Sequence, residues 1–546
     1  MSRILFNNQP AAPVIDTGRA DVACFVGLVR LLSGATVSAA LTSWLRSLGY
    51  SAARIATLTN VPLVFESYPA FTAMFDDGSS GDGYGTDYVA AAVRSFFAQG
   101  GKRCYVVRVD DPLKPQDSVA IPGQPVVKTT KLQELLPSPA YSPGDAATWT
   151  GLGALAALEE VSYVATPDLA ALCASEPVGA VGQLPVAQSG PQEFTACTQG
   201  EIVPQQMATY AAAAPRLAAA DYATWASTVA VILNYLCSGP STNQLHLREM
   251  QFVTAFPMPQ DMDVATAAEN PSADEIAQDI HTVIGQYLLE PNVLPVGGAP
   301  NLSSRFLQLA YPWLKTSGSG TLLEQLEPPD GALVGLLARN ALTRGAFTSA
   351  TKIMPSEIYD VQPTLPDQEM QSSATPLTWG PNSPQKALIE RLSLFGPSPA
   401  GMELLSDVTA YAGESYRAGA VNRLVNVIYR ASRMIGEISV FQNNGPALWG
   451  RIQRALQNLM TRAWTLGALD GATVAEAFTV ICDQSTMTQN DLDNGRLIAL
   501  VTFAPAALVE TITLTLAMET TGTSVQAIAA NIATSNMASS SWAGAS

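Results

Sequence analysis

Residues 448–505, "LWGRIQRALQNLMTRAWTLGALDGATVAEAFTVICDQSTMTQNDLDNGRLIALVTFAP", contain the clearest succession of a helix pattern and strand patterns in the chain. Their first third has apolar residues at helical spacing, which predicts an amphipathic helix. The predicted apolar stripe consists of Leu448, Ile452, Leu456, Leu459, Ala463 and Leu466. Arg451, Arg454 and Arg462 lie off this stripe. The segments "AFTVICD" and "RLIALVTFAP" then predict two strands, so the stretch predicts a helix and a sheet in one domain.

Residues 482–497, "CDQSTMTQNDLDNGRL", combine a thiol with three carboxylates, which raises the question of an active site. A calcium loop with Gly495 at its glycine position would place Leu492 and Val501 where oxygen ligands belong, so calcium binding is excluded. Cys482 ends an apolar strand and has no histidine nearby in sequence to activate it as a nucleophile. A structural thiol is therefore the favoured interpretation.

The same residues also have a purely structural explanation. Thr488 and Asp491 have the spacing of a capping box, which predicts the start of a short helix. Asn494 and Gly495 predict the left-handed residue that ends this helix before the next strand. Residues 482–497 are thus predicted to connect two strands.

A strictly alternating segment, "ETITLTLAME", follows this block. It predicts a strand with Ile512, Leu514, Leu516 and Met518 on one face and threonines on the other. No charged residue follows Glu519, and the remaining Ser, Thr, Ala and Gly-rich sequence predicts a mobile tail.

The amino-terminal part of the chain alternates strand and helix patterns. "DVACFVGLV", "VPLVF" and "KRCYVVRV" predict buried strands, and "TDYVAAAVRSFFAQGG" predicts a helix that ends at glycine. This order predicts an α/β layer. Proline-rich segments interrupt it, so an insertion without regular elements is expected at about 112–147 and a second insertion at about 174–205. Prolines in 355–384 indicate the main domain boundary.

Charge and hydropathy exclude several classes of partner. The net charge of −17 repels the phosphates of nucleic acids and anionic lipids. No segment reaches the roughly 20 apolar residues of a membrane span, and the start of the chain does not have the pattern of a secretory signal. Only 14% of the residues are charged and 47% are hydrophobic, which favours a folded protein with much surface against other protein.

The reactive residues form no catalytic or metal-binding pattern. The six cysteines are scattered singly and favour buried thiols in a reducing compartment, and neither His246 nor His281 has a partner at ligand spacing. The glycine-rich "GSSGDGYG" lacks the lysine of a phosphate-binding loop, and nearby aspartates would repel phosphate. We therefore expect no catalytic residue, no metal site and no cofactor.

The order of these segments resembles the contractile tail sheath proteins of bacteriophages and of phage-tail-like contractile injection systems. The similar segments include "VPLVFESYPAFTAMFDDG", "DYVAAAVRSFFAQGGKRCYVVRV", "AYPWLK" followed by "EPPDGALVGLLARNALTRGAF", and the block at 448–505. Together they extend over most of the chain outside the insertions. In this comparison, residues 482–497 resemble the strand–turn–strand of the sheath's carboxy-terminal domain.

The resemblance implies a mixed α+β, multi-domain sheath fold. The expected limits are an arm at 1–20, an amino-terminal α/β domain at 21–375, an inner carboxy-terminal domain at 376–505, and a linker strand with a mobile tail at 506–546. The carboxy-terminal domain is expected to be completed by strands exchanged between neighbouring subunits. The expected exchanged strands contain Ile512, Leu514, Leu516 and Met518 and, near the start, Ile4 and Phe6.

The resemblance also implies a structural role and no enzyme activity. Copies of the chain would polymerise helically around an inner tube and contract from a metastable extended state, which drives the tube through a target envelope. The implied partners are further copies, the tube protein, and baseplate and cap proteins, and Arg451, Arg454 and Arg462 become candidates for facing the tube. Assembly is expected in the bacterial cytoplasm, as part of a phage tail or a phage-tail-like particle.

Two alternatives remain open from the sequence. A baseplate or cap component with the same domain would share these patterns, and a soluble α/β enzyme would share the strand and helix order. The scarcity of histidine weighs against the enzyme.

Overall fold

The computed structural model describes residues 18–79, 85–114, 117, 126–175, 180–182, 209–211, 213–237, 244–260, 302–365, 370, 388–411, 415–439, 442–506, 512–519 and 522–528. Contacts divide the chain into two compact units, Met1–Ala412 and Gly413–Ser546. The expected start of the carboxy-terminal domain at residue 376 lies outside the described residues, and the domain limits stay a prediction. The mixed α/β fold class is confirmed, because both units combine helices with a sheet.

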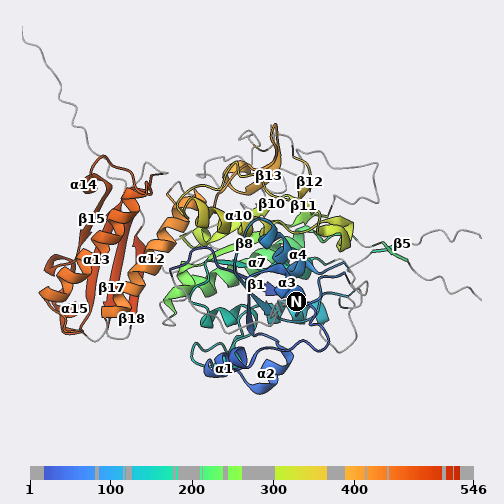
Figure 1. Cartoon of the computed structure of the whole chain (residues 1–546), viewed down its shortest axis with the longest axis horizontal. Helices are drawn as coiled ribbons and strands as arrows, with labels where there is room; N and C mark the ends of the chain where they lie inside the picture. The colour runs from blue at the N-terminus through green and yellow to red at the C-terminus, as the bar shows by residue number, and fades with distance from the viewer. Residues whose placement is uncertain are drawn as a thin grey trace, which may run out of the picture. The chain divides into compact units, whose positions relative to one another are not determined.

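An eight-stranded sheet forms the centre of the first unit, with the strand order β14-β13-β10-β8-β4-β1-β3-β2 (Figure 1). Its strands are β1 (Ala23–Gly27), β2 (Pro62–Phe65), β3 (Cys104–Arg108), β4 (Tyr163–Ala165), β8 (Gln251–Ala255), β10 (Leu307–Tyr311), β13 (Ser393–Ser398) and β14 (Gly401–Leu404). Pairing is parallel from β3 to β13, and only the outermost strands β2 and β14 pair in antiparallel fashion. Parallel sheets are covered on both faces, which explains why β1, β8 and β10 are buried along their whole length.

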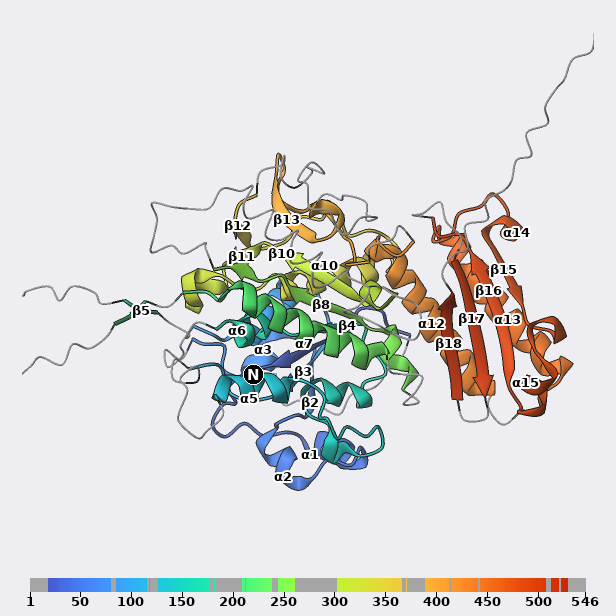
Figure 2. The same cartoon turned by 180° about the vertical axis from the view of Figure 1, so that it is seen from behind.

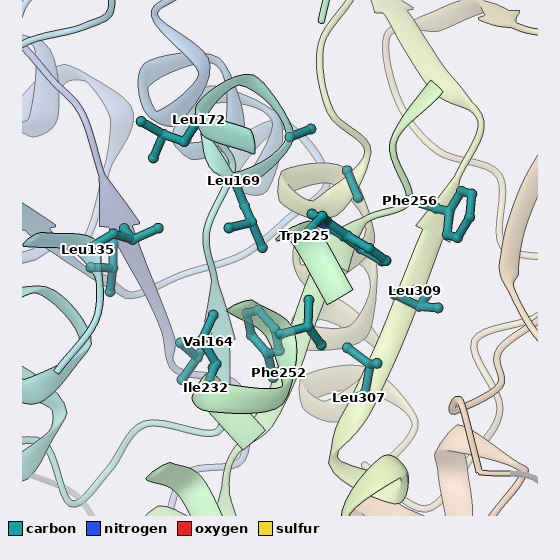
Figure 3. Close-up of a cluster of buried hydrophobic side chains, with 14 of the residues drawn as sticks. Leu135, Val164, Leu169, Leu172, Trp225, Ile232, Phe252, Phe256, Leu307 and Leu309 are labelled. Atoms are coloured by element: carbon teal, nitrogen blue, oxygen red, sulfur yellow. The ribbon is translucent and has the colours of Figure 1, made fainter. Parts of the chain in front are cut away.

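Alternate residues of β1 belong to two different hydrophobic clusters, since successive side chains of a strand point to opposite faces. On the face of Cys24, the sheet is covered by α6 (Leu169–Cys173) and α7 (Ala219–Cys237). Figure 3 shows Trp225 of α7 in this cluster, together with residues of β4, β8 and β10.

The opposite face, to which Phe25 of β1 contributes, is covered by α4 (Tyr88–Ala98) and α10 (Asp330–Thr343). Phe25 packs edge-on against Phe96 of α4, with ring centroids 5.7 Å apart. The two helices also pack directly on each other. The sheet therefore has one helical layer on each face.

Smaller elements surround this core. The other helices of the first unit whose bounds lie within the described residues are α1 (Ala39–Ser47), α2 (Ala52–Thr57), α3 (Tyr68–Thr72) and α5 (Val127–Leu135). Three two-stranded sheets pair β5 (Ala180–Gly182) with β6 (Thr209–Ala211), β7 (Arg216–Leu217) with β9 (Met258–Pro259), and β11 (Trp313–Thr316) with β12 (Ile358–Gln362). Short 3₁₀ helices lie at Ala146–Thr148, Gly151–Ala157, Leu245–Glu249, Leu302–Phe306, Ser319–Thr321, Leu323–Gln325 and Leu388–Glu390.

Helix α5 corrects the expectation that residues 112–147 contain no regular element. Pro125 and Pro137 flank the helix, so neither ring interrupts its hydrogen bonds. Its buried side is unusual, because Lys128 and Lys131 are buried beside Leu135. Lys128 donates to the carbonyl of Ala174, and Lys131 forms ion pairs with Asp110 and Asp117 at 3.3 and 3.1 Å. Because two lysines occupy the inner face of the helix, the sequence contains no stripe of apolar residues at helical spacing.

The second unit contains a four-stranded antiparallel sheet with the order β15-β16-β17-β18 (Figure 2). Its strands are β15 (Phe478–Ile481), β16 (Leu497–Phe503), β17 (Ile512–Glu519) and β18 (Gly522–Ile528). Its helices are α12 (Gly419–Ser439), α13 (Pro446–Thr465), α14 (Val474–Ala477) and α15 (Gln489–Asp493), with a 3₁₀ turn at Gln484–Thr486. Helices α12 and α13 contact each other, α12 contacts β18, and α13 contacts β15.

Candidate assembly site

The connection between β15 and β16 has the structural role that the sequence indicated. Thr488 accepts a hydrogen bond from the Asp491 amide at 3.2 Å, and the Asp491 carboxylate accepts from the Thr488 amide at 2.9 Å, which together form a capping box. Hydrogen bonds from Thr488 lower the pKa of Asp491. Gly495 has a φ of 68°, the left-handed conformation that ends the helix. The polar groups of this segment are therefore used to build the turn.

The described cysteines and histidine are buried in structural environments. Cys482 is 1% exposed, and burial raises the pKa of its thiol to about 11. The other described cysteines, whose pKa burial also raises, are Cys24, Cys104, Cys173 and Cys237. His246 has its Nε2 atom 3.2 Å from the carbonyl oxygen of Leu155, while Cys197 and His281 lie outside the described residues. Thiols with raised pKa are poor nucleophiles at neutral pH.

No three His, Cys, Asp or Glu side chains within the described ranges are grouped so that they could hold a metal ion. The glycine-rich segment is described only up to Ser79 and again from Gly85. At its start, Asp76 accepts a hydrogen bond from the Gly78 amide and Asp77 accepts one from the Ser79 amide, both at 3.1 Å. These carboxylates stabilise their own turn and occupy amides that could otherwise contact an anion.

The helix α13 has a buried stripe that differs partly from the predicted one. Its buried residues are Leu448, Ile452, Leu456 and Met460, at a spacing of four. Leu459 and Ala463 are half-buried, and Leu466 is 60% exposed. Leu466 follows the last residue of the helix, Thr465, so it no longer shares the helix face that packs on the sheet.

The three predicted tube-facing arginines are exposed on α13. Arg451 donates to the side chain of Gln442 at 2.5 Å, and Arg454 donates to the carbonyl of Gly450 at 2.9 Å. Arg462 lies in the last turn of the helix, where a cation is favourable. The helix contains no acidic residue, so it presents a positive surface on a chain of net charge −17.

The predicted exchanged strand is β17, and in this structure it pairs within its own chain. Its register places Ile512, Leu514, Leu516 and Met518 opposite Phe503, Val501, Ala499 and Leu497 of β16, which are all buried. The other edge of β17 pairs with β18. Ile4 and Phe6 of the predicted amino-terminal strand lie outside the described residues.

Strand β18 was not predicted, because residues 522–528 fall in the segment whose composition predicts a mobile tail. The available signal was weak, namely Thr523, Val525 and Ile528 after a glycine in a segment without charge. Such residues favour strands, but the alternation is too short and too polar to distinguish a strand from a Ser/Thr-rich tail.

Among the described helices, none has the length and apolar character needed to cross a membrane.

Comparisons with known proteins identify similar folds. No family model and no curated relative matches the chain. A chain in the anti-feeding prophage (AFP) baseplate in contracted state has a TM-score of 0.50 at 15% identity, with 92% of this chain and 95% of that chain covered. A chain in the AFP helical sheath in contracted state has a TM-score of 0.47 at 15% identity, covering 92% and 94%.

A third solved structure is a sheath tail protein from Listeria innocua, with a TM-score of 0.45 at 10% identity and coverage of 92% of this chain and 95% of that chain. The similarity to the AFP baseplate chain extends over nearly the whole length of both chains, so it is a similarity of the complete fold. The resemblance stated from the sequence is therefore confirmed at the level of the fold, which this chain shares with a chain of the AFP baseplate in contracted state.

Proposed function

We propose that this protein is the structural subunit of a contractile tail sheath. Copies polymerise helically around an inner tube and contract from a metastable extended state to drive the tube through a target envelope. The observation that supports this most directly is the fold shared with a chain of the AFP baseplate in contracted state over 92% of the sequence. The turn-building role of residues 482–497 and the buried cysteines fit a protein without catalytic chemistry.

The proposed partners are further copies of the chain, the inner tube protein, and baseplate and terminal cap proteins. No nucleotide or cofactor takes part, because the energy for contraction is stored when the extended sleeve assembles. The proposed location is the bacterial cytoplasm during assembly, followed by a phage tail or phage-tail-like particle.

Exchange of the carboxy-terminal strand is the proposed link between neighbouring subunits. Seven residues of β17 pair with β16 through the backbone, from Ile512 opposite Phe503 to Met518 opposite Leu497. An identical strand from another copy can form the same ladder, because backbone pairing does not depend on which chain supplies the strand. Such a head-to-tail contact does not close on itself and therefore generates a helical polymer.

The test is negative-stain electron microscopy of the protein expressed alone. Hollow striated sleeves of uniform width are the expected result. A chain in an AFP baseplate has this fold, so a baseplate component is the second candidate, and it would give closed rings or small discs of fixed size. A persistent monomer, also in the presence of tube and baseplate, would contradict both assignments.

A charge reversal tests the proposed tube contact of α13. The triple variant Arg451→Glu, Arg454→Glu and Arg462→Glu is expected to weaken co-sedimentation with assembled tubes by about tenfold or more at low salt. The reason is that three exposed cations become anions on a helix that lacks acidic residues.

The matched control reverses Arg46 and Arg344, which are exposed in the first unit and should leave tube binding unchanged. The difference in tube binding between the triple variant and the wild type should shrink as the salt concentration rises, because salt screens exposed charges. Equal binding by the triple variant and the wild type at low salt would contradict the tube contact.

A further inference from the structure

Two acidic residues are buried where α10 begins against α4, and within the described residues neither of them forms an ion pair. Glu327 and Asp330 are 1% and 0% exposed. The helices approach closely here, because a Cβ atom at Gly331 would lie 2.4 Å from the Cα of Ala92. Glu327 and Asp330, named here the carboxyl pair, therefore lie at a tightly packed helix junction of the first unit.

The surroundings of Glu327 consist mainly of hydroxyl groups. Its backbone pairs with Leu314 of β11, which fixes its position, and its carboxyl oxygens accept hydrogen bonds from Ser95 of α4 and, at 2.9 Å, from Thr316 of β11. Asp330 and the hydroxyl of Tyr68 interact with it electrostatically, and the other charged groups that face it are Arg94 and Glu357. These two form an ion pair with each other at 3.6 Å, so the available cation is already shared with another acid.

Asp330 has still fewer partners. Neither carboxyl oxygen forms a well-aligned hydrogen bond within the described residues, although the amides of Asp330 itself and Gly331 lie near it at the helix start. The charged neighbours that face it are the acid Glu327 and, beyond β4, the buried Asp168. Lys131, a cation that acts on Asp168 electrostatically, is paired with Asp110 and Asp117.

Burial is the largest cause of the raised pKa values of the carboxyl pair. It raises the pKa of Glu327 to about 7 and the pKa of Asp330 to about 7, against ordinary values near 4. For Glu327 the hydrogen bonds from Ser95 and Thr316 oppose this rise, and for Asp330 the neighbouring amides oppose it. Both side chains are thus held in the neutral form below neutral pH.

We propose that the carboxyl pair makes the contact between α4 and α10 proton-dependent, so that the junction is closed while Glu327 and Asp330 are protonated and opens when they ionise. The pair stabilises the closed junction only in its neutral form, because two buried carboxylates without a dedicated counter-ion are unfavourable. The stabilisation is fully present below pH 4 and is lost as the pH rises through about 7. Between pH 6 and 8.5 the opening equilibrium is expected to rise by about tenfold for each group.

Hydrogen exchange of the full-length protein measures this opening directly. After correction for the intrinsic pH dependence of exchange, peptides of α4 and the start of α10 should lose at least about tenfold in protection between pH 6 and 8.5. Peptides of α13 in the second unit are the internal control, and they should not change. A loss of protection in both units would indicate general unfolding or disassembly and would overturn the proposal.

The double variant Glu327→Gln and Asp330→Asn keeps the shapes of the side chains but cannot ionise. Its protection against hydrogen exchange at the junction should stay nearly constant from pH 6 to 8.5. At pH 8.5 this protection should exceed that of the wild type. The exposed Asp483→Asn is the matched control and should behave as the wild type. If the double variant does not fold, the pH dependence of hydrogen exchange in the wild type tests the proposal by itself. Protection at α4 and α10 that does not change with pH would contradict the proposal.

Discussion

Ending the chain after Pro505 is expected to leave a folded first unit and to abolish assembly into sleeves. The truncation removes β17 and β18, so β16 loses its seven-residue ladder from Leu497 to Phe503. Each unpaired backbone group at this edge loses a hydrogen-bond partner, and no strand remains to be given to a neighbouring subunit. Negative-stain microscopy and sedimentation should then show soluble monomers where the wild type forms sleeves.

A second truncation, after Ile528, is the matched control. It removes residues 529–546 and keeps both β17 and β18. If strand exchange links the subunits, this variant should form sleeves as the wild type does. Normal sleeves from the chain that ends at Pro505 would contradict strand exchange through β17, whatever the fold of the second unit.

Local sequence patterns were sufficient to predict the elements that depend on neighbouring residues alone or that are buried along their whole length. The apolar runs of β1 and β3 predicted buried strands, because both faces of a parallel sheet are covered. Thr488 and Asp491 predicted the helix start correctly, because a capping box depends on residues three positions apart and on nothing else. The alternating residues of β17 predicted a strand for a similar reason.

The sequence was insufficient where distant residues determine the structure. Helix α5 buries Lys128 and Lys131, and their oxygen partners come from other segments, so hydropathy could not indicate its inner face. The same holds for Glu327 and Asp330, which lie in the loop-like "EPPDG" and become buried only when α10 packs on α4. Charged residues in a proline-rich segment are ordinarily exposed, and only tertiary contacts reverse that expectation.

Replacement of Gly331 by alanine is expected to destabilise the first unit by about 2–3 kcal/mol, the upper range for an overpacked core position. The added Cβ would lie 2.4 Å from both the Cα and the carbonyl oxygen of Ala92. These are backbone atoms of α4, so the contact can be relieved only by moving one helix away from the other. Helix separation would also loosen the packing of Phe96 under β1.

The matched control is Gly450→Ala in α13, where, apart from the adjoining helix backbone, no atom of the described residues lies within 4 Å of the added Cβ. Alanine is favoured over glycine inside a helix, so this variant should be more stable by about 0.5–1 kcal/mol. Chemical denaturation followed by probes of each unit measures both effects, and the same substitution should change stability in opposite directions at the two sites. Equal stability of Gly331→Ala and the wild type would mean that α4 and α10 can separate at little cost, and the close helix contact would then not determine the stability of the unit.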